Sequence, residues 1–266
     1  MSSGIEIFSL QNKIALVTGA TGYLGRAMVQ VLAEAGALVL VNGRNEEHVS
    51  TLVKEICEQG LKAESAVFDI TDETAIKNYF TSLNNKPLDI LINNAYFGSS
   101  GNIKCSKAGA YIDSHNVTVV ASHNLLTNAL PHLRQAVGVR GDASIINLAS
   151  MYGMVSPDQR IYETEQAANP PFYGAAKAAF IQWTRYAACE FGKEQIRVNS
   201  ISPGAFPSID VQKINPEFIS KLENKIPMGR IGQANELQGS VLFLASSASS
   251  YVNGSNLVVD GGWTCW

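Results

Sequence analysis

The sequence is poor in the residues that build metal centres and disulfide frameworks. Its 266 residues include only four cysteines and four histidines. The cysteines form no Cys-x-x-Cys pair, and no two histidines show the His-x-x-x-His spacing of a metal site. We therefore expect no bound metal and four ordinary thiols at Cys57, Cys105, Cys189 and Cys265.

Long apolar runs and an excess of one charge are also lacking. The first residues, MSSGIEIFSLQNK, contain no basic segment followed by an apolar one, and no run approaches the ~18 residues of a membrane span. The net charge is −3 and only 16% of residues are charged, which does not favour a nucleic-acid surface. Hydrophobic residues, at 46%, suffice for a substantial core. We expect one cytoplasmic domain over residues 1–266, with neither a membrane nor a nucleic-acid partner.

Short runs of Val, Ile and Leu alternate along the chain with longer stretches of helical period. Near-continuous apolar runs separated by about a dozen or more residues are typical of buried parallel strands joined by helices. The sequence thus predicts a doubly wound α/β Rossmann fold, a seven-stranded and mostly parallel sheet with helices on both faces. Ligands of such sheets bind beyond the carboxyl ends of the strands. The seven runs are IALVTG, LVLVNGR, ESAVFD, LDILINNA, SIINLAS, IRVNSIS and NLVVDGG.

A glycine-rich turn, TGATGYLG at residues 18–25, follows the first predicted strand and leads into the helical stretch RAMVQVLAEAG. Glycines permit a tight turn and let a diphosphate approach the free N–H groups of a helix start. A turn without a ligand also favours glycine, but the place after the first strand favours a dinucleotide site. The candidate contacts are Gly19, Thr21, Gly22, Tyr23, Leu24 and Gly25.

The second and third predicted strands end in charged residues. Arg44 lies about where an NAD-binding unit presents an acid to the adenosine ribose. Its guanidinium can hold a 2′-phosphate, so we predict NADP, with NAD as the alternative. Asp69 and Ile70 end the third strand, where an adenine would be contacted. The alternatives are that Arg44 only begins a solvated helix and that Asp69 caps the next helix.

A tyrosine and a lysine lie four residues apart in a predicted helix. The run FYGAAKAAFIQWTRYAACEF follows Pro171 and stops before Gly192, as helices do. Residues four apart share a helix face, so Tyr173 and Lys177 point the same way. Lowering a phenol pKa from ~10 to neutrality takes roughly 4 kcal/mol, much of which an adjacent cation supplies in a partly dry site. An isolated pair of this kind is also common on helix surfaces.

Further polar residues end the fourth and fifth predicted strands or lie in a helix. The fourth strand closes with Asn93-Asn94-Ala95, where asparagines either tie strand ends together beside a cofactor or mark a plain turn. Ser150 ends the fifth strand, at the floor of the expected crevice. Asn116 lies in a helical stretch from about 108 to 137, where an exposed helix asparagine is the alternative.

Taken together, these residues resemble the short-chain dehydrogenase/reductase family in its single-domain form. The resemblance implies an NAD(P)(H)-dependent oxidoreductase that interconverts a secondary alcohol and a ketone, in a homo-oligomer that is a tetramer or a dimer. A weaker likeness, in the SMYG-VSPD run and the GGWT-x-W tail, is to members of bacterial surface-sugar and nonulosonate pathways. The matching pieces, in order from Lys13 to Gly262, are TGATGYLG, FDITD, LDILINNA, Asn116, SIINLAS, YGAAK, RVNSISPG, IPMGRIG and VLFLASSASSYVNGSNLVVDGGW.

The resemblance also implies a role for each candidate. Tyr173 would be the general acid/base, and Lys177 would lower its pKa and bind the nicotinamide ribose. Ser150 would hydrogen-bond the substrate oxygen, and Asn116 would hold a water that links Lys177 to solvent. Residues after the sixth strand would line the nicotinamide and the diphosphate, namely Pro203, Gly204, Phe206 and Ser208. The cofactor would also border Asn93 and Ala95 at the end of the fourth strand.

Three features depart from the family pattern. Tyr23 stands where the first turn usually has glycine, and Tyr96 follows Asn-Asn-Ala in place of glycine, as a bulky wall near the nicotinamide. The third is an extra segment between Ser150 and Tyr173, PDQRIYETEQAANPP at residues 157–171. We expect substrate loops at about 151–172 and 205–230, the second a mobile lid. The segment either suits a hydroxyl-rich substrate or is a solvated loop; its polar groups are Asp158, Gln159, Arg160, Tyr162 and Glu163.

Two other functions stay open. A sugar-nucleotide epimerase or dehydratase uses the same tyrosine and lysine, but needs a larger carboxyl-terminal substrate domain. A non-catalytic dinucleotide-binding regulator fits the altered glycine turn and Tyr96, but would be expected to have lost Tyr173 or Lys177. A serine hydrolase is disfavoured, because Ser150 lacks the Gly-x-Ser-x-Gly turn.

Overall fold

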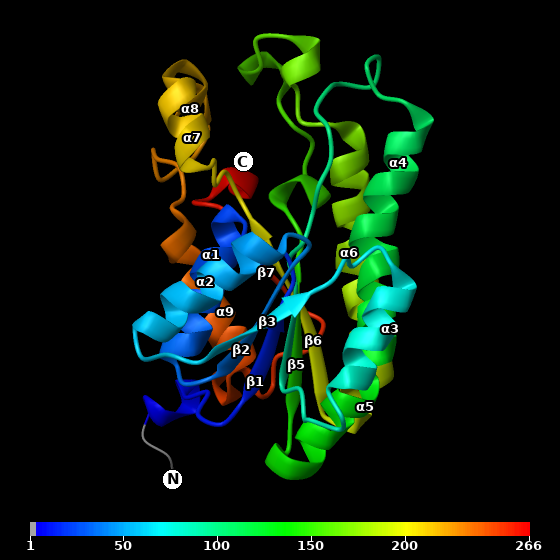
Figure 1. The fold of residues 1–266 in the computed structure, drawn as a ribbon. Coiled ribbons are helices and arrows are strands. Elements are labelled where there is room, and N and C mark those ends of the chain that lie inside the picture. Colours follow the sequence, from blue (N-terminus) through cyan, green and yellow to red (C-terminus); the bar gives the residue numbers. More distant parts are fainter. Residues whose placement is uncertain (1–3) are drawn as a thin grey trace.

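The seven predicted strands form one sheet in the computed structural model, which describes residues 4–266. The strand order is β3-β2-β1-β4-β5-β6-β7, and all neighbouring strands are parallel (Figure 1). This confirms the predicted fold class. The strands are β1 (Ile14–Val17), β2 (Leu38–Gly43), β3 (Ala63–Val67), β4 (Ile90–Asn93), β5 (Ala143–Leu148), β6 (Ile196–Pro203) and β7 (Asn256–Val259).

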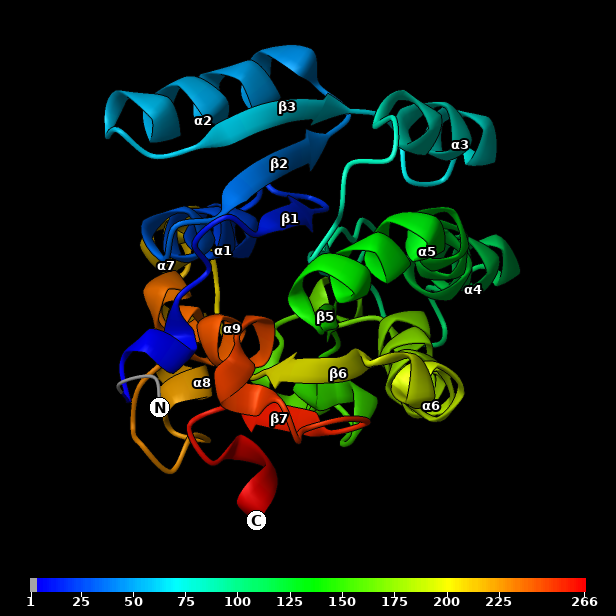
Figure 2. The ribbon, with the colours of Figure 1, turned by 90° about the horizontal axis from the view of Figure 1, so that it is seen from below.

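Helices cover both faces of this sheet (Figure 2). One face carries α1 (Tyr23–Glu34), α2 (Glu46–Glu58) and α9 (Gln238–Ala245). The other carries α3 (Glu73–Ser82), α4 (Ala108–His115), α5 (Ala121–Arg140) and α6 (Pro171–Phe191). Two shorter helices, α7 (Ile209–Ile214) and α8 (Pro216–Glu223), lie beyond one end of the sheet (Figure 1).

The core consists of two apolar layers, one on each face of the sheet. Val17 of β1 packs into the layer under α1 and α9, whereas Leu16, the residue before it, packs into the layer under α5. Both side chains are fully buried. Successive strand residues point to opposite faces, so a strand that is buried on both faces needs the continuous apolar run that the sequence shows.

The site lies where the winding of the chain reverses. β1 pairs with β2 on one side and with β4 on the other, which opens a crevice beyond the carboxyl ends of these strands. The connections after β4, β5 and β6 all project from that end of the sheet, together with α7 and α8 (Figure 1). The position of the site is therefore set by strand order, before any particular side chain is considered.

Candidate active site

The turn between β1 and α1 is pressed against the segment that follows β4. Gly19 has a φ of +60°, and a Cβ at this position would lie 2.8 Å from the Cα of Ala95. A Cβ on Gly25 would clash with the Gly19 carbonyl oxygen. The Asn94 side chain donates hydrogen bonds to the carbonyls of Thr18 and Gly19, at 2.9 and 3.1 Å. Glycine is therefore required at both positions for the turn to close this tightly.

The first turn of α1 is left without a side-chain cap. Gly22 is the N-cap residue, and no side chain accepts a hydrogen bond from the first N–H groups. Tyr23 points its hydroxyl away, toward Gln233 at 3.5 Å and the backbone N–H of Ala234 at 3.4 Å. Free N–H groups at a helix start favour an anion, so this turn fits a diphosphate.

These N–H groups border a hollow of about 450 Å³, which we call the α1 hollow. It runs from the glycine turn across the ends of β2, β3 and β4, which is the extent expected for a dinucleotide. Most of the predicted cofactor contacts lie here. The lining is Gly19, Thr21, Gly22, Tyr23, Leu24, Gly25, Asn42, Gly43, Arg44, Phe68, Asp69, Ile70, Asn94, Ala95, Tyr96, Phe97, Val117, Phe206 and Ser208.

Arg44 and Asp69 face each other at one end of the α1 hollow. Their side chains form an exposed ion pair at 3.7 Å, and the Arg44 guanidinium lies 5.0 Å from the centre of the Phe97 ring. Partial burial opposes ionisation of Asp69, but hydrogen bonds from Thr71 and the charge of Arg44 hold its pKa below the usual value. The caps of the next helices are Asn45 and Asp72, so neither Arg44 nor Asp69 is needed for capping. Phe97 was not anticipated, although it directly follows the singled-out Tyr96.

Five of the predicted cofactor contacts do not line the α1 hollow, namely Asn93, Tyr173, Lys177, Pro203 and Gly204. The Asn93 side chain is buried and donates a hydrogen bond to Asn147 Oδ1 at 2.8 Å, which ties β4 to β5. Its neighbour Asn94 lines the α1 hollow instead, since adjacent residues of an extended chain point to opposite sides. Pro203 ends β6 and lines neither this hollow nor the next one.

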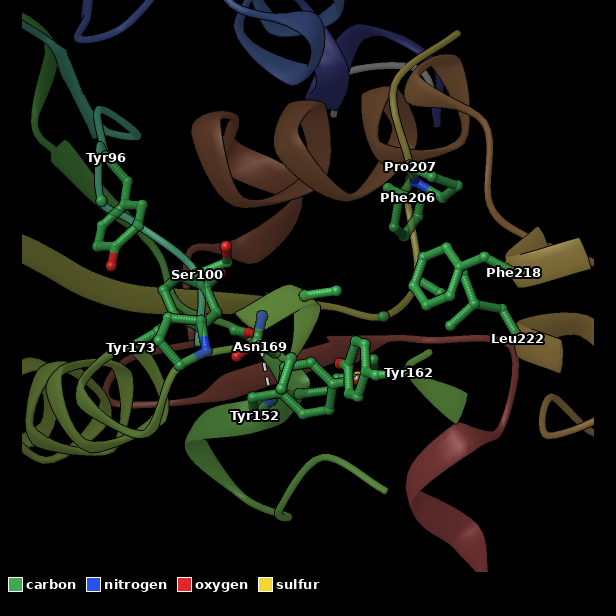
Figure 3. A pocket seen from close by; sticks show the side chains of 18 of the residues that line it. Tyr96, Ser100, Tyr152, Tyr162, Asn169, Tyr173, Phe206, Pro207, Phe218 and Leu222 are labelled. Carbon is green, nitrogen blue, oxygen red and sulfur yellow. Dashed lines mark hydrogen bonds between the residues drawn. The ribbon is translucent and has the colours of Figure 1, made fainter. Parts of the chain in front are cut away.

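A second hollow, of about 690 Å³, adjoins the first, and we call it the Tyr173 hollow (Figure 3). Tyr96 and Phe206 line both hollows, so a molecule in one can touch a molecule in the other. The predicted residues Ser150, Tyr173 and Gly204 also line this second hollow. Its full lining is Tyr96, Gly98, Ser99, Ser100, Ser150, Met151, Tyr152, Tyr162, Ala167, Ala168, Asn169, Pro170, Tyr173, Gly204, Ala205, Phe206, Pro207, Phe218 and Leu222.

Tyr173 and Lys177 lie together on the face of α6 that is turned toward the strand ends. The Lys177 Nζ is 5.7 Å from the Tyr173 ring centre and 5.4 Å from that of Tyr96. It donates a hydrogen bond to the Leu148 carbonyl at 2.5 Å and is only 3% exposed. Lys177 therefore lies behind the two phenol rings rather than at the surface of the hollow.

Ser150 is brought to α6 by close backbone contact. It begins the 3-10 turn Met151–Gly153, and its Oγ accepts a hydrogen bond from the Tyr152 N–H at 3.1 Å. This turn packs directly on α6: a Cβ on Gly174 would lie 2.7 Å from the Tyr152 carbonyl oxygen, and one on Gly153 would lie 2.9 Å from the backbone of Lys177. Two glycines thus let the end of β5 approach Tyr173.

The pKa of Tyr173 is raised in the structure, whereas the sequence led us to expect that Lys177 would lower it. Burial raises it above the usual phenol value, the Ser150 hydroxyl opposes this rise, and Tyr96 adds to it. Burial also lowers the pKa of Lys177 to about 7. Both shifts have one physical cause, because loss of water disfavours the charged form of an acid and of a base alike. The two residues meet as predicted, but here burial outweighs any lowering of the phenol pKa by the ammonium.

Asn116 lines neither of the two hollows. The predicted helix over 108–137 is interrupted by a π-turn, Asn116–Val120, between α4 and α5. Asn116 is exposed and lines a separate hollow with Tyr111, Phe172 and Ala175, on the outer side of α4 and α6. Thr118, two positions on and roughly on the opposite face of the helix, is buried instead. Periodicity alone gave no sign of this break.

Comparisons with known proteins show the family to which this chain belongs. A family profile described as enoyl-(acyl carrier protein) reductase matches residues 19–264. Gluconate 5-dehydrogenase of Gluconobacter oxydans (strain 621H) is 34% identical, over 97% of this chain and 97% of its own. A solved short-chain type dehydrogenase/reductase from Mycobacterium marinum has a TM-score of 0.85 and 31% identity, over 100% of both chains. This chain belongs to the short-chain dehydrogenase/reductase family.

This short-chain dehydrogenase/reductase is an NAD(P)(H)-dependent oxidoreductase. A similar solved structure, a gluconate 5-dehydrogenase from Burkholderia cenocepacia J2315 in complex with NADP and tartrate, covers 99% of this chain and 100% of its own, with 28% identity and a TM-score of 0.87. The α1 hollow fits such a cofactor on its own features: the close-packed glycine turn, the uncapped start of α1 and the Arg44 guanidinium. In residues 4–266, no three His, Cys, Asp or Glu side chains are placed to hold a metal ion.

Tyr96 is the departure from the family pattern with the clearest structural effect. Its ring packs edge-on against that of Tyr173, with centres 4.8 Å apart and an interplanar angle of 71°. Its hydroxyl lies 3.3 Å from Ser114 Oγ, which donates to the Phe172 carbonyl at 3.2 Å. The expectation of a bulky wall near the reacting centre is consistent with this position. Tyr96 helps to bury Lys177 and separates part of the two hollows.

The extra segment enters the site only in part. Tyr162 lines the Tyr173 hollow, with its hydroxyl 3.4 Å from that of Tyr152. Asp158 instead forms ion pairs with Arg160, at 2.7 Å, and with Lys225, and these hold its pKa well below the usual value. The two remaining polar residues of the prediction are exposed, namely Gln159 and Glu163. The polar wall was predicted from composition, which does not show which side chains pair with one another.

Proposed function

We propose that this enzyme uses NADP(H) to interconvert a secondary alcohol and a ketone on a polar, hydroxyl-bearing molecule. The observation that carries the proposal is the meeting of Ser150, Tyr173 and Lys177 at the border of two adjoining hollows. One hollow fits a dinucleotide, and the other is open and lined by hydroxyl groups. Two adjoining sites with a proton donor between them suit hydride transfer.

The protein supplies proton transfer and orientation in this reaction. A bound nicotinamide supplies or accepts the hydride. In the reductive direction, the Tyr173 hydroxyl gives its proton to the substrate oxygen, and Ser150 donates a hydrogen bond that holds that oxygen. The charged form of Lys177 stabilises the phenolate that remains, and the phenolate regains a proton from solvent. Oxidation reverses each step.

The choice of NADP over NAD is assigned to Arg44. Its guanidinium is 61% exposed at the end of the α1 hollow and is paired only loosely with Asp69, at 3.7 Å. Because a phosphate binds a guanidinium more strongly than a single distant carboxylate does, a 2′-phosphate can displace this pairing. Arg44→Asp is expected to weaken NADPH binding at least ~10-fold and to favour NADH, as measured by fluorescence titration. Unchanged NADPH affinity would exclude Arg44 from that role.

The substrate class is supported by the lining and by the relatives. The Tyr173 hollow carries the hydroxyls of Ser99, Ser100 and Tyr152 and the amide of Asn169. Curated relatives include 2-dehydro-3-deoxy-D-gluconate 5-dehydrogenase of Formosa agariphila, which is 28% identical over 97% of this chain and 95% of its own. Polar groups that converge in a hollow beside an apolar wall suit a sugar-like molecule.

The test is NADPH oxidation with a panel of ketoses, keto acids and apolar ketones. Turnover of hydroxyl-bearing ketones supports the proposal. Tight nucleotide binding without oxidation of any ketone points to a regulator. NAD that survives purification, with no net oxidation, points to an epimerase or dehydratase.

We also propose a homo-oligomer, a dimer or tetramer, and a cytoplasmic location. Large apolar side chains are exposed on the outer side of α4 and α6, including Ile112 at 62% and Tyr186 at 69%. All four cysteines are free, which suits a reducing compartment. Within the described part of the chain, no helix is long and apolar enough to cross a membrane. Light scattering and cell fractionation test these two statements.

A further inference from the structure

We propose that the substrate of this enzyme is uncharged: a hydroxyl-bearing ketone or alcohol without a carboxylate or phosphate. This inference rests on the proposed function and narrows it. It also separates this chain from relatives whose names specify an acid as substrate. Two features of the Tyr173 hollow carry it, namely the absence of a facing cation among the described residues and a lining of uncharged hydroxyl, amide and apolar groups.

No lysine, arginine or histidine is among the described residues that line the Tyr173 hollow. Its charged neighbours are bound elsewhere. Lys177 lies behind the phenol rings and donates to the Leu148 carbonyl. Arg44 is in the α1 hollow beside Asp69. An anion in this hollow would give up water without gaining a cationic partner, which is unfavourable.

The nearest basic cluster is turned to another surface. Arg160 and Lys225 both pair with Asp158, and they line a separate hollow beside Trp266. Both cations thus already have a carboxylate partner on that other surface. The extra segment 157–171 therefore contains a cation, Arg160, that is near Tyr173 in the sequence but does not line the Tyr173 hollow.

The polar wall of the hollow is made of uncharged hydroxyl groups. The hydroxyls of Tyr152 and Tyr162 are 3.4 Å apart, and both rings are anchored, by Trp263 at 6.4 Å and by Phe218 at 5.8 Å. Burial raises the pKa of both phenols, so both hydroxyls are uncharged near neutral pH. The loss of water that disfavours a phenolate here also disfavours a substrate carboxylate that meets no cation.

Asn169 adds an uncharged polar group to the lining of the Tyr173 hollow (Figure 3). Its Oδ1 is buried from solvent and has no hydrogen-bond partner among the described residues, so this atom does not face the hollow. An amide side chain can hydrogen-bond a substrate hydroxyl, but it does not supply the positive charge that a carboxylate or phosphate needs. Across the hollow, Phe206, Phe218 and Leu222 form an apolar wall that suits the C–H face of a sugar or polyol.

The deciding experiment compares matched neutral and acidic substrates on the native chain. The pairs are D-fructose with 5-keto-D-gluconate for reduction by NADPH, and sorbitol with D-gluconate for oxidation by NADP. Methyl acetoacetate with acetoacetate forms a third pair, which lacks the sugar hydroxyls. The neutral member is expected to have a kcat/KM at least ~10-fold higher, a difference of about 1.4 kcal/mol. Equal or higher kcat/KM for the acidic members would overturn the inference.

A binding measurement keeps the inference testable without turnover. Dissociation constants of the same pairs are measured by calorimetry on the Tyr173→Phe variant loaded with NADPH. Tighter binding of the neutral members supports the inference, and tighter or equal binding of the acids contradicts it. Failure of the proposed function looks different, because no ketone in any pair would then oxidise NADPH with the native chain.

Two variants test the residues that set the preference. Phe218→Arg places a guanidinium on the apolar wall and is expected to shift kcat/KM at least ~10-fold toward the acids, whereas Phe218→Leu is not. Asn169→Leu removes the amide that lines the hollow and is expected to lower kcat/KM for D-fructose several-fold while leaving methyl acetoacetate little changed. An unchanged fructose preference in Asn169→Leu would contradict the assigned role of Asn169. Should Phe218→Arg fail to fold, the native-chain pairs still decide.

Discussion

Lys177 is an amine that is almost fully removed from water, and this burial shifts its pKa toward neutral pH. It is 3% exposed, is enclosed by the rings of Tyr96, Tyr173 and Phe180, and has a backbone carbonyl as its hydrogen-bond acceptor. Burial lowers its pKa to about 7. A lysine that changes charge near neutral pH can both support a phenolate and pass on a proton.

This burial predicts a pH dependence of stability. The pKa of Lys177 is about 7 in the folded chain and ~10.4 in the unfolded one. Between these values the unfolded chain binds more protons at this position, so Lys177 makes the free energy of unfolding rise with pH across that window. The contribution is at most ~1.4 kcal/mol per pH unit. Urea unfolding of the ligand-free chain at pH 7, 8 and 9 measures it, with Lys177→Met as the control. Identical pH profiles for the two proteins would show that the pKa is not shifted.

Tyr173 is the residue on which turnover depends in the proposed mechanism. Tyr173→Phe removes the hydroxyl that gives or takes the proton and leaves the α1 hollow intact. Turnover is expected to fall ~1,000-fold or more, while NADPH affinity changes less than ~3-fold. Steady-state kinetics and fluorescence titration measure the two quantities. Wild-type rates in the variant would rule out Tyr173 as the acid/base.

At the level of single residues, the sequence was most informative where spacing or strand ends fix geometry. Helix spacing placed Tyr173 beside Lys177, and the end of β5 placed Ser150 near both. Asn116 lines neither hollow and begins a π-turn that nothing in the local pattern marks, so its role stays a prediction. The role of Asp158 could not be predicted, since its partner Lys225 comes from a segment far along the chain.

At the scale of elements, the site depends on how closely the 3-10 turn Met151–Gly153 approaches α6. Gly174→Ala adds a methyl that would lie 2.7 Å from the Tyr152 carbonyl oxygen, so the turn must move away and carry Ser150 with it. We expect kcat/KM to fall at least ~10-fold with little change in NADPH affinity. Gly138→Ala in α5 is the matched control, because a Cβ there meets nothing within 4 Å. That variant should keep full activity and gain up to ~1 kcal/mol of stability from helix propensity. Equal kinetics in both variants would contradict the role of this contact.

The strands were predictable as elements, and the loops were not. The five strands between the edge strands β3 and β7 are buried on both faces, so their apolar runs are visible without knowledge of their partners. The segment 205–230, expected to be a loop lid, instead contains α7 and α8, which begin at the caps Ser208 and Asn215. Both helices are short, and helices of this length are held mainly by tertiary contacts, which a local pattern does not show.

At the scale of the whole molecule, the outer side of α4 and α6 is the surface that we expect to form contacts between subunits. Ile112 of α4 and Tyr186 of α6 are well exposed there, as is Val120 in the π-turn at 40%. Large apolar side chains gathered on adjacent helices mark an interaction surface more often than chance exposure does. α6 carries Tyr173 and Lys177 on its inner side, so an assembly on this face would also hold the catalytic helix in place.

An assembly on this face makes the oligomeric state sensitive to charge at two positions. The double variant Ile112→Glu with Tyr186→Glu places like charges on both copies of the interface, and we expect light scattering to show a monomer where the native chain is a dimer or tetramer. Tyr251→Glu is the control, since Tyr251 is fully exposed in the loop before β7. If the double variant keeps the native mass, subunits associate through another surface. A native chain that is already monomeric at micromolar concentration would contradict the proposed oligomer itself, and α6 would then be held only by its contacts within the subunit.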